Sequence, residues 1–224
     1  TFIGGLAGDA ITTGNSNIAL GYQALSADTT GDRSTALGFQ TLANQNFTSN
    51  TDTYNTAVGY NAGVNVTTGL ENTLIGGEAG DALTDADFNV AVGRQALSAD
   101  TLAIGWGALR VQNFTSAAST YNTAVGMNAG TSITTGTQNA LIGGLAGDAL
   151  TDADSNVAMG HSSLSTDTLG SRSVAIGASA LEAQNFTSAT NTYNVAVGTL
   201  AGAAVTTGIN NTLIGGIAGD AITT

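Results

Sequence analysis

A tandem repeat of two lengths is the feature that most constrains how this chain folds. The phrase Ile-Gly-Gly-x-Ala-Gly-Asp begins at Ile3 and returns at Ile75, Ile142 and Ile214, so the long repeats are 72, 67 and 72 residues. Inside each one a shorter unit recurs, with a polar residue, a strand-forming residue, a small residue, an apolar residue and then glycine. Units this short cannot each bury a core, so they must stack, and the sequence predicts a solenoid.

The spacing of these glycines sets the size of one coil. They are Gly4, Gly21, Gly38, Gly59, Gly76, Gly93, Gly105, Gly126, Gly143, Gly160, Gly177, Gly198 and Gly215. Most gaps are 17 or 21 residues, and the gap from Gly93 to Gly105 is only 12 because five turn-type residues are missing there. A unit that tolerates all three lengths is a compact coil with surface loops, since loops absorb length changes at small cost.

The local pattern within a coil indicates a strand and not a helix. In 55–59 and its copies, β-branched residues flank a small one, and glycine or asparagine recurs every few positions. Each glycine would cost a helix about 1 kcal/mol, whereas the β-branched residues suit a strand. We therefore expect an all-β fold, a β-solenoid or β-roll of about 13 coils that fills residues 1–224 as one segment of a longer chain.

Alternation along the strand divides its side chains between two faces. Thr56 and Val58 share one face and Ala57 takes the other. Because the residue before the glycine is always Leu, Val, Ile or Met, we assign that residue to the coil interior. The small central residues would then form an outward apolar stripe, joined by Leu25, Leu42 and Leu74, and such a stripe marks an interface. The predicted interface residues are Ala57, Ala91, Ala124, Ala158 and Ala196.

A cyclic homo-oligomer would close this stripe around the rod axis. We expect three chains, although the periodicity by itself also allows two.

The two corners of each coil are assigned to glycine and asparagine. Glycine such as Gly59 suits a corner with positive φ or close backbone approach. Asparagine such as Asn55 tolerates the left-handed region, and stacked coils would align these asparagines as a ladder.

Composition excludes several classes of partner. The net charge is −12, with four arginines and no lysine, which disfavours nucleic acids and anionic membranes. The chain has no cysteine, so disulfide scaffolds and thiolate metal sites are excluded. No run of 18 apolar residues and no basic leader are present, so we expect neither a transmembrane span nor a signal peptide in this segment.

The repeat resembles two families of trimeric fibre. The runs 156–160, 173–180 and 194–198 resemble the head repeats of trimeric autotransporter adhesins, which form left-handed β-rolls. The longer cassette, with its Gln-Asn-Phe-Thr-Ser and Thr-Tyr-Asn-Thr-Ala-Val-Gly segments at 45–59, is more similar to the repetitive shafts of bacteriophage tail fibres. The resemblance spans essentially the whole chain and implies the roll's handedness and the trimer.

Acidic loops are the candidates for a cation. The phrase that ends at Asp81 and Asp148 resembles the calcium-binding nonapeptide of parallel β-helices, but it recurs about every 70 residues instead of every nine. The candidate ligands are Asp81, Asp85, Asp87, Asp148, Asp152 and Asp154. The first long repeat has Thr12–Asn15 in place of the Thr-Asp-Ala-Asp loop, so we interpret these carboxylates as solvated and expect no cofactor, with calcium as the alternative.

The position after the corner glycine is the most variable. It holds Tyr22, Phe39, Tyr60, Arg94, Trp106, Met127 and His161. The lone histidine cannot build a zinc site or a catalytic triad, so we expect it to be an exposed variable residue. The aromatics Tyr22, Phe39, Tyr60 and Trp106 either contact glycans or protein, or pack against a neighbouring chain or loop. Phe47, Phe114 and Phe186 are expected to anchor the longer excursions.

These observations favour a mechanical function. We expect a fibre shaft that holds a receptor-binding tip, outside this segment, away from a virion. The alternative is a bacterial surface adhesin or an extracellular filament that binds host or surface glycans. No nucleophile, base and orienting group recur together, so we do not expect an enzyme.

Overall fold

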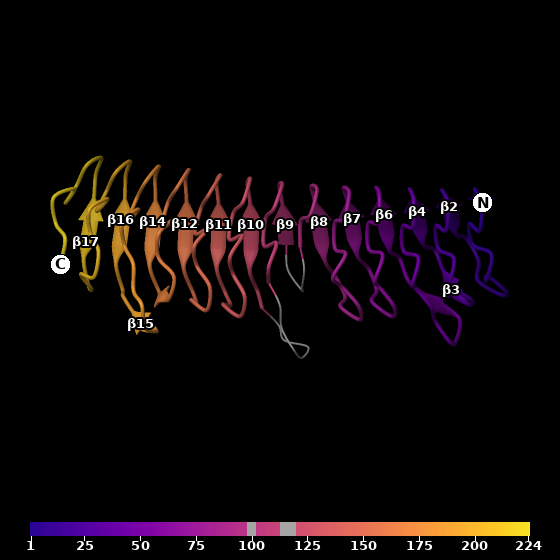
Figure 1. Cartoon of the computed structure of the whole chain (residues 1–224). Helices are drawn as coiled ribbons and strands as arrows, with labels where there is room; N and C mark the ends of the chain where they lie inside the picture. Colours follow the sequence, from indigo (N-terminus) through magenta and orange to yellow (C-terminus); the bar gives the residue numbers. More distant parts are fainter. Residues whose placement is uncertain (98–101, 113–119) are drawn as a thin grey trace. The chain divides into compact units, whose positions relative to one another are not determined.

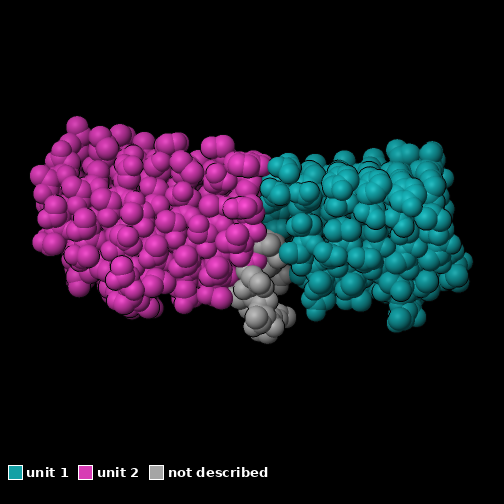
Figure 2. Space-filling view, viewed as in Figure 1, with its two compact units in different colours: residues 1–102 teal, residues 103–224 magenta. Residues whose placement is uncertain are grey.

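A computed structural model describes residues 1–97, 102–112 and 120–224 of the chain. The described part is all-β, without helix, and forms a parallel β-solenoid of about 12 turns (Figure 1). The chain divides into two compact units, Thr1–Leu102 and Ala103–Thr224, which are coloured separately in Figure 2. The expected all-β solenoid is therefore confirmed.

Unit 1 stacks its coils so that each adds one strand to a parallel sheet. The strand order is β1-β2-β4-β6-β7-β8, and equivalent residues pair directly, as in Ala57 with Leu74. β3 and β5 form a separate two-stranded sheet in the loops below (Figure 1). The bounds are β1 (Phe2–Ile3), β2 (Ile18–Leu20), β3 (Gly31–Asp32), β4 (Thr35–Leu37), β5 (Thr51–Asp52), β6 (Thr56–Val58), β7 (Thr73–Ile75) and β8 (Val90–Val92).

Unit 2 repeats this arrangement. Its strands follow the order β10-β11-β12-β14-β16-β17, and β13 pairs with β15 as β3 pairs with β5. β9 (Leu102–Ile104) begins at the last residue of unit 1. The other bounds are β10 (Thr123–Val125), β11 (Ala140–Ile142), β12 (Val157–Met159), β13 (Gly170–Ser171), β14 (Val174–Ile176), β15 (Thr190–Asn191), β16 (Val195–Val197) and β17 (Thr212–Ile214).

The two faces of the strands are opposite to the assignment made from the sequence. The central residues Ala57, Ala91, Ala124, Ala158 and Ala196 are fully buried inside their own coils. The apolar residue before each corner glycine points outward and is exposed, as at Ile75 or Ile142, or half-buried, as at Val58. The predicted alanine interface is therefore wrong, because the strand centre faces the thin interior of the coil, where a small side chain leaves room for a leucine from the corner.

Leucines from the corner fill the space that the small strand residues leave. Leu25 and Leu42 lie four residues after their corner glycines and are fully buried, so they belong to the interior and not to an outer stripe. Leu74 occupies the strand centre of its own coil, and the matching corner positions are then glycines. A Cβ at Gly63 or Gly80 would lie 2.7 Å from a Leu74 methyl group. The strand centre and the corner therefore share one space in the core, which a leucine from either position fills.

Both predicted corners exist, with one change at the asparagine side. Every corner glycine from Gly21 to Gly215 has a positive φ, and a Cβ at Gly59 would lie 2.5 Å from the carbonyl oxygen of Gly76. The left-handed residue at the other corner is the one before the asparagine, for example Tyr54 with φ 49° before Asn55. The corner glycines are thus confirmed, whereas the asparagine itself does not adopt the left-handed conformation.

The asparagine ladder is confirmed by its hydrogen bonds. The Asn72 backbone N–H donates to Asn55 Oδ1 at 2.9 Å, and the Asn89 N–H donates to Asn72 Oδ1 at 3.0 Å. Asn55 Nδ2 also donates to the Gly69 carbonyl at 2.7 Å. These amides are buried, so each one satisfies backbone groups of its own coil and of the next.

Candidate functional site

The outer face of each strand row carries no charge. The first and third residues of the three-residue strands are Ile, Leu, Val, Met, Thr or Ala throughout the described chain. In-register pairing aligns them into rows, as in Leu20 with Leu37 and Val58 with Ile75. Ile75 is 40 % exposed although it lies in the middle of a sheet row. The third residues are all Leu, Val, Ile or Met, and an apolar row that extends over many coils is characteristic of an interaction face.

An aromatic stack lies beside the glycine corner of unit 1. Tyr22, Phe39 and Tyr60 are all exposed, as is Trp106 elsewhere in the chain. The ring centroids of Tyr22 and Phe39 are 5.5 Å apart, and those of Phe39 and Tyr60 are 5.3 Å apart, with the planes 20° and 10° from parallel. Because the rings cover one another's faces, the stack presents mainly ring edges to solvent.

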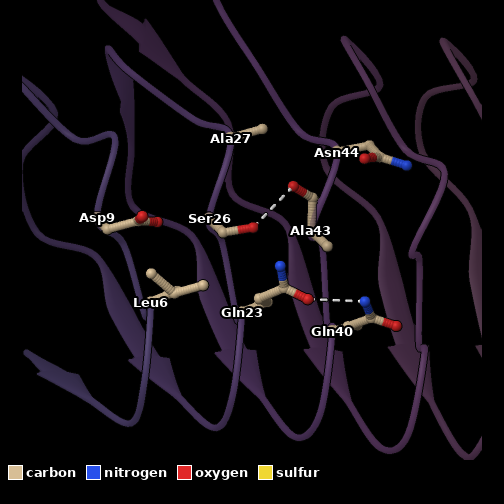
Figure 3. Close-up of a pocket in the computed structure, with 8 residues that line it drawn as sticks. All are labelled: Leu6, Asp9, Gln23, Ser26, Ala27, Gln40, Ala43 and Asn44. Atoms are coloured by element: carbon tan, nitrogen blue, oxygen red, sulfur yellow. Dashed lines mark hydrogen bonds between the residues drawn. The ribbon is translucent and has the colours of Figure 1, made fainter.

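A shallow groove of about 270 Å³ includes Gln23 and Gln40, the residues that follow Tyr22 and Phe39 in the sequence (Figure 3). Three successive coils line it with equivalent positions, so that Leu6, Gln23 and Gln40 form one row. Asp9, Ser26 and Ala43 form the second row, with Ala27 and Asn44 beyond it. Gln40 Nε2 donates to Gln23 Oε1 at 2.8 Å. The groove combines a carboxylate and amide groups with small residues that leave space above them.

The acidic loop residues bind the protein itself. Asp87 Oδ1 accepts from the Leu70 N–H at 2.7 Å, and Asp154 Oδ1 accepts from the Thr137 N–H at 2.7 Å. Asp85 accepts from the Thr84 hydroxyl at 3.1 Å, and Asp152 from the Thr135 hydroxyl at 2.6 Å. Within residues 1–97, 102–112 and 120–224, no three His, Cys, Asp or Glu side chains gather as a metal site would require.

Asp81 and Asp148, the remaining two candidates, differ from these four. Partial burial raises the pKa of both carboxyl groups, and for Asp81 the nearby Glu78 carboxylate raises it further. Asp148 Oδ1 is buried and has no hydrogen-bond partner among the described residues. Each therefore costs stability when ionised.

A buried polar network was missed by the sequence interpretation. Gln45 Nε2 donates to Asp28 Oδ2 at 2.7 Å and to Ser34 Oγ at 2.8 Å. Asn55 Nδ2 donates to Gln45 Oε1 at 2.9 Å. Asp28 and Gln45 lie seven residues after a corner glycine. Several other coils have an apolar residue at this position, such as Val66. A polar residue at a position that is apolar in these coils was the feature of the sequence that could have revealed the network.

The predicted anchors and the variable histidine lie where the sequence placed them. Phe47 and Phe186 are buried beneath the excursions that lead to β5 and β15. Phe114 lies outside the described residues. His161 is exposed and its Nδ1 contacts the Ser162 hydroxyl at 3.0 Å. The buried phenylalanines support the interpretation that the longer loops are anchored to the coil by one aromatic side chain each.

No protein-family model, curated protein or solved structure matches this chain. The described residues include no helix of the length and apolarity needed to cross a membrane.

Proposed function

We propose that this chain is a structural, non-enzymatic segment of a fibre shaft that associates with copies of itself. The observation that carries the proposal is the uncharged outer face of the strand rows. The chain has 16 acidic residues, yet none occupies an outward position of the three-residue strands in the described ranges. A second copy meets this face without charge repulsion, and association removes exposed Ile, Val and Leu side chains from water.

Three chains around a common axis close such a face without leaving an open edge. The similarity of the cassette to phage tail-fibre shafts favours this number and a place in a virion, outside cells. The shaft would set the distance between its base and a receptor-binding tip that belongs to another segment. A bacterial surface adhesin with the same trimeric roll is the alternative, and it has the same interface.

A charge on the outer face tests self-association. Ile75→Asp places a carboxylate in the middle of the β7 row, and Phe88→Asp is the matched control, since Phe88 is 72 % exposed in the turn before β8. Both residues are exposed in the single chain, so both variants should fold. Light scattering should give three times 22.0 kDa for the wild type and the control, and a smaller mass for Ile75→Asp because buried, unpaired charges oppose assembly. A wild-type mass of one chain, or an unchanged mass for Ile75→Asp, would contradict the proposal.

A further inference from the structure

The groove over Gln23 and Gln40 offers hydrogen-bonding groups that the protein does not use. The Gln40 to Gln23 bond occupies one N–H of Gln40 and the oxygen of Gln23. Gln23 Nε2, Gln40 Oε1 and the Asp9 carboxylate make no side-chain hydrogen bond to the described part of the chain. Free donor and acceptor groups thus lie in two adjacent rows of the groove, the amides of Gln23 and Gln40 in one and the Asp9 carboxylate in the other (Figure 3).

The equivalent positions three and four coils further on do not offer the same groups. There Gln95 Nε2 donates to Glu78 Oε2 at 2.8 Å, and Arg94 lies 3.6 Å from the same carboxylate. The acidic group is therefore engaged by two neighbours, and the place holds one positive and one negative charge. The groove is a local feature of the first coils and not a property of every repeat.

The chemistry of the groove favours a neutral ligand rich in hydroxyl groups. Asp9 and the chain's net charge of −12 repel anions, and the lining contains no cationic side chain. The groove is lined by Leu6, Asp9, Gln23, Ser26, Ala27, Gln40, Ala43 and Asn44, far fewer residues than the roughly 20 to 30 on each side that a stable protein partner needs. Sugar hydroxyls both donate and accept, which matches amides beside a carboxylate, and the exposed Leu6 side chain suits the C–H face of a sugar ring.

The direction of the groove also fits a polymer. Its rows run across the coils, and neighbouring strands in a sheet are about 4.8 Å apart, close to the advance of one sugar residue along a polysaccharide. Successive residues of a sugar chain laid along the groove would therefore meet the equivalent positions Leu6, Gln23 and Gln40 in turn. Each hydrogen bond alone would be weak, because the groove is shallow, and a polymer that spans its three coils would make several of them at once.

We infer that this groove binds a neutral polysaccharide, with Gln23 donating to a sugar oxygen and with Gln40 and Asp9 accepting from sugar hydroxyls. The inference does not depend on the shaft function, because the groove lies within one chain and uses none of the outward strand positions.

Affinity electrophoresis of the full chain through gels that contain mannan, dextran or a neutral galactan tests it, with hyaluronate as the anionic probe. The variants are Gln23→Asn and Gln40→Asn, with Gln95→Asn as control. Gln23, Gln40 and Gln95 have φ of 54°, 51° and 56°, which asparagine tolerates. The substitution should therefore shorten the side chain that carries the amide without unfolding the coil. At least one neutral polysaccharide should retard the wild type and the control equally. The apparent affinity of the two groove variants for that polysaccharide should be lower by a factor of at least about three.

Three outcomes would overturn the inference. They are no retardation of the wild type by any neutral polysaccharide, equal retardation of the groove variants, and retardation by hyaluronate alone. Thermal unfolding of each variant by circular dichroism confirms that a loss of binding is not a loss of fold. A wild-type mass of one chain in light scattering would contradict the proposed shaft function. It would not change the interpretation of the polysaccharide-binding measurement.

Discussion

Two regions of the chain, 28–55 in unit 1 and 167–194 in unit 2, have the same interior and different surfaces. In the first, Gln45 Nε2 lies 2.7 Å from Asp28 Oδ2 and 2.8 Å from Ser34 Oγ. In the second, Gln184 makes the corresponding bonds at 2.6 and 2.8 Å, to Asp167 and Ser173. The network is reproduced almost atom for atom in two separate stacks.

The surfaces above these networks have diverged. Arg33 in the first region pairs with Asp52 and lies over the Tyr54 ring. Arg172 in the second lies over Tyr193 in the same way, but Asn191 replaces the aspartate. The aromatic stack of the first repeat is likewise replaced, at the equivalent positions, by His161, Ala178 and Thr199.

The difference teaches that the coil interior is the constrained part of the repeat. An interior polar group must find its partner in the next coil, because an unpaired buried group costs about 1 to 3 kcal/mol. Surface positions have no such partner to match, so they vary and can acquire local features such as the groove. We therefore expect differences in ligand binding between repeats to arise from residues on the outer surface of the coils.

Breaking the interior network should have the largest effect, and an equal one in both regions. Gln45→Leu leaves the Asp28 carboxylate without its side-chain donor, and Gln184→Leu does the same to Asp167. We expect each to cost about 2 to 3 kcal/mol and to lower Tm by roughly 5 to 10 °C in thermal unfolding.

A second substitution gives the control. Asp28→Leu added to Gln45→Leu should not recover the loss, because Asp28 Oδ1 also accepts from the backbone N–H groups of Gly31 and Phe47, and these buried donors would then lack a partner. A loss more than twice as large in one region as in the other would refute the equivalence of the two interiors.

A smaller effect should distinguish two copies of the same phrase. Burial raises the pKa of Asp148, whereas its counterpart Asp9 is exposed. An aspartate whose folded-state pKa is raised takes up a proton more readily in the folded chain, so its ionisation lowers stability as the pH rises through that pKa. Asp148→Asn should raise Tm at pH 7 by about 1 to 3 °C and remove this part of the pH dependence.

Asp9→Asn is the matched control and should change Tm by less than a degree or so. Thermal unfolding at pH 3, 5 and 7 measures both variants. If Asp148→Asn were destabilising at pH 7, the carboxylate would have a partner that this structure does not show.

The sequence predicted the framework well because the framework is periodic. Gly59 and its copies marked a corner that no side chain fits, and Asn55 and its copies marked a ladder, since each recurs at the coil spacing. The buried Asp28 and Gln45 were missed because only two coils of the long repeat carry them, and their meaning depends on the partner in the next coil.

The inverted strand faces have a different cause. Val58 is larger and more apolar than Ala57, so ordinary hydrophobic ranking placed it inside. The covariation of Leu74 with Gly63 and Gly80 contained the correct answer, because a large residue at the strand centre coincides with glycine at the corner only if the two share the interior. Ala124→Asp is accordingly expected to disrupt its own coil and not only an assembly.

Removing a whole number of coils tests most directly the claim that the fold is a stack of interchangeable units. Deletion of residues 60–126 joins Gly59 to Met127, removes β7, β8, β9 and β10, and leaves each remaining coil with an equivalent neighbour. Deletion of 60–127 is the control, because it displaces Asn128 and Gly130, with φ of 56° and 58°, by one residue. Thermal unfolding by circular dichroism should show the first protein with the wild-type strand signal per residue and one cooperative transition, and the second strongly destabilised. If the in-phase deletion were unfolded, or no more stable than the out-of-phase one, the stacked-coil account would be wrong.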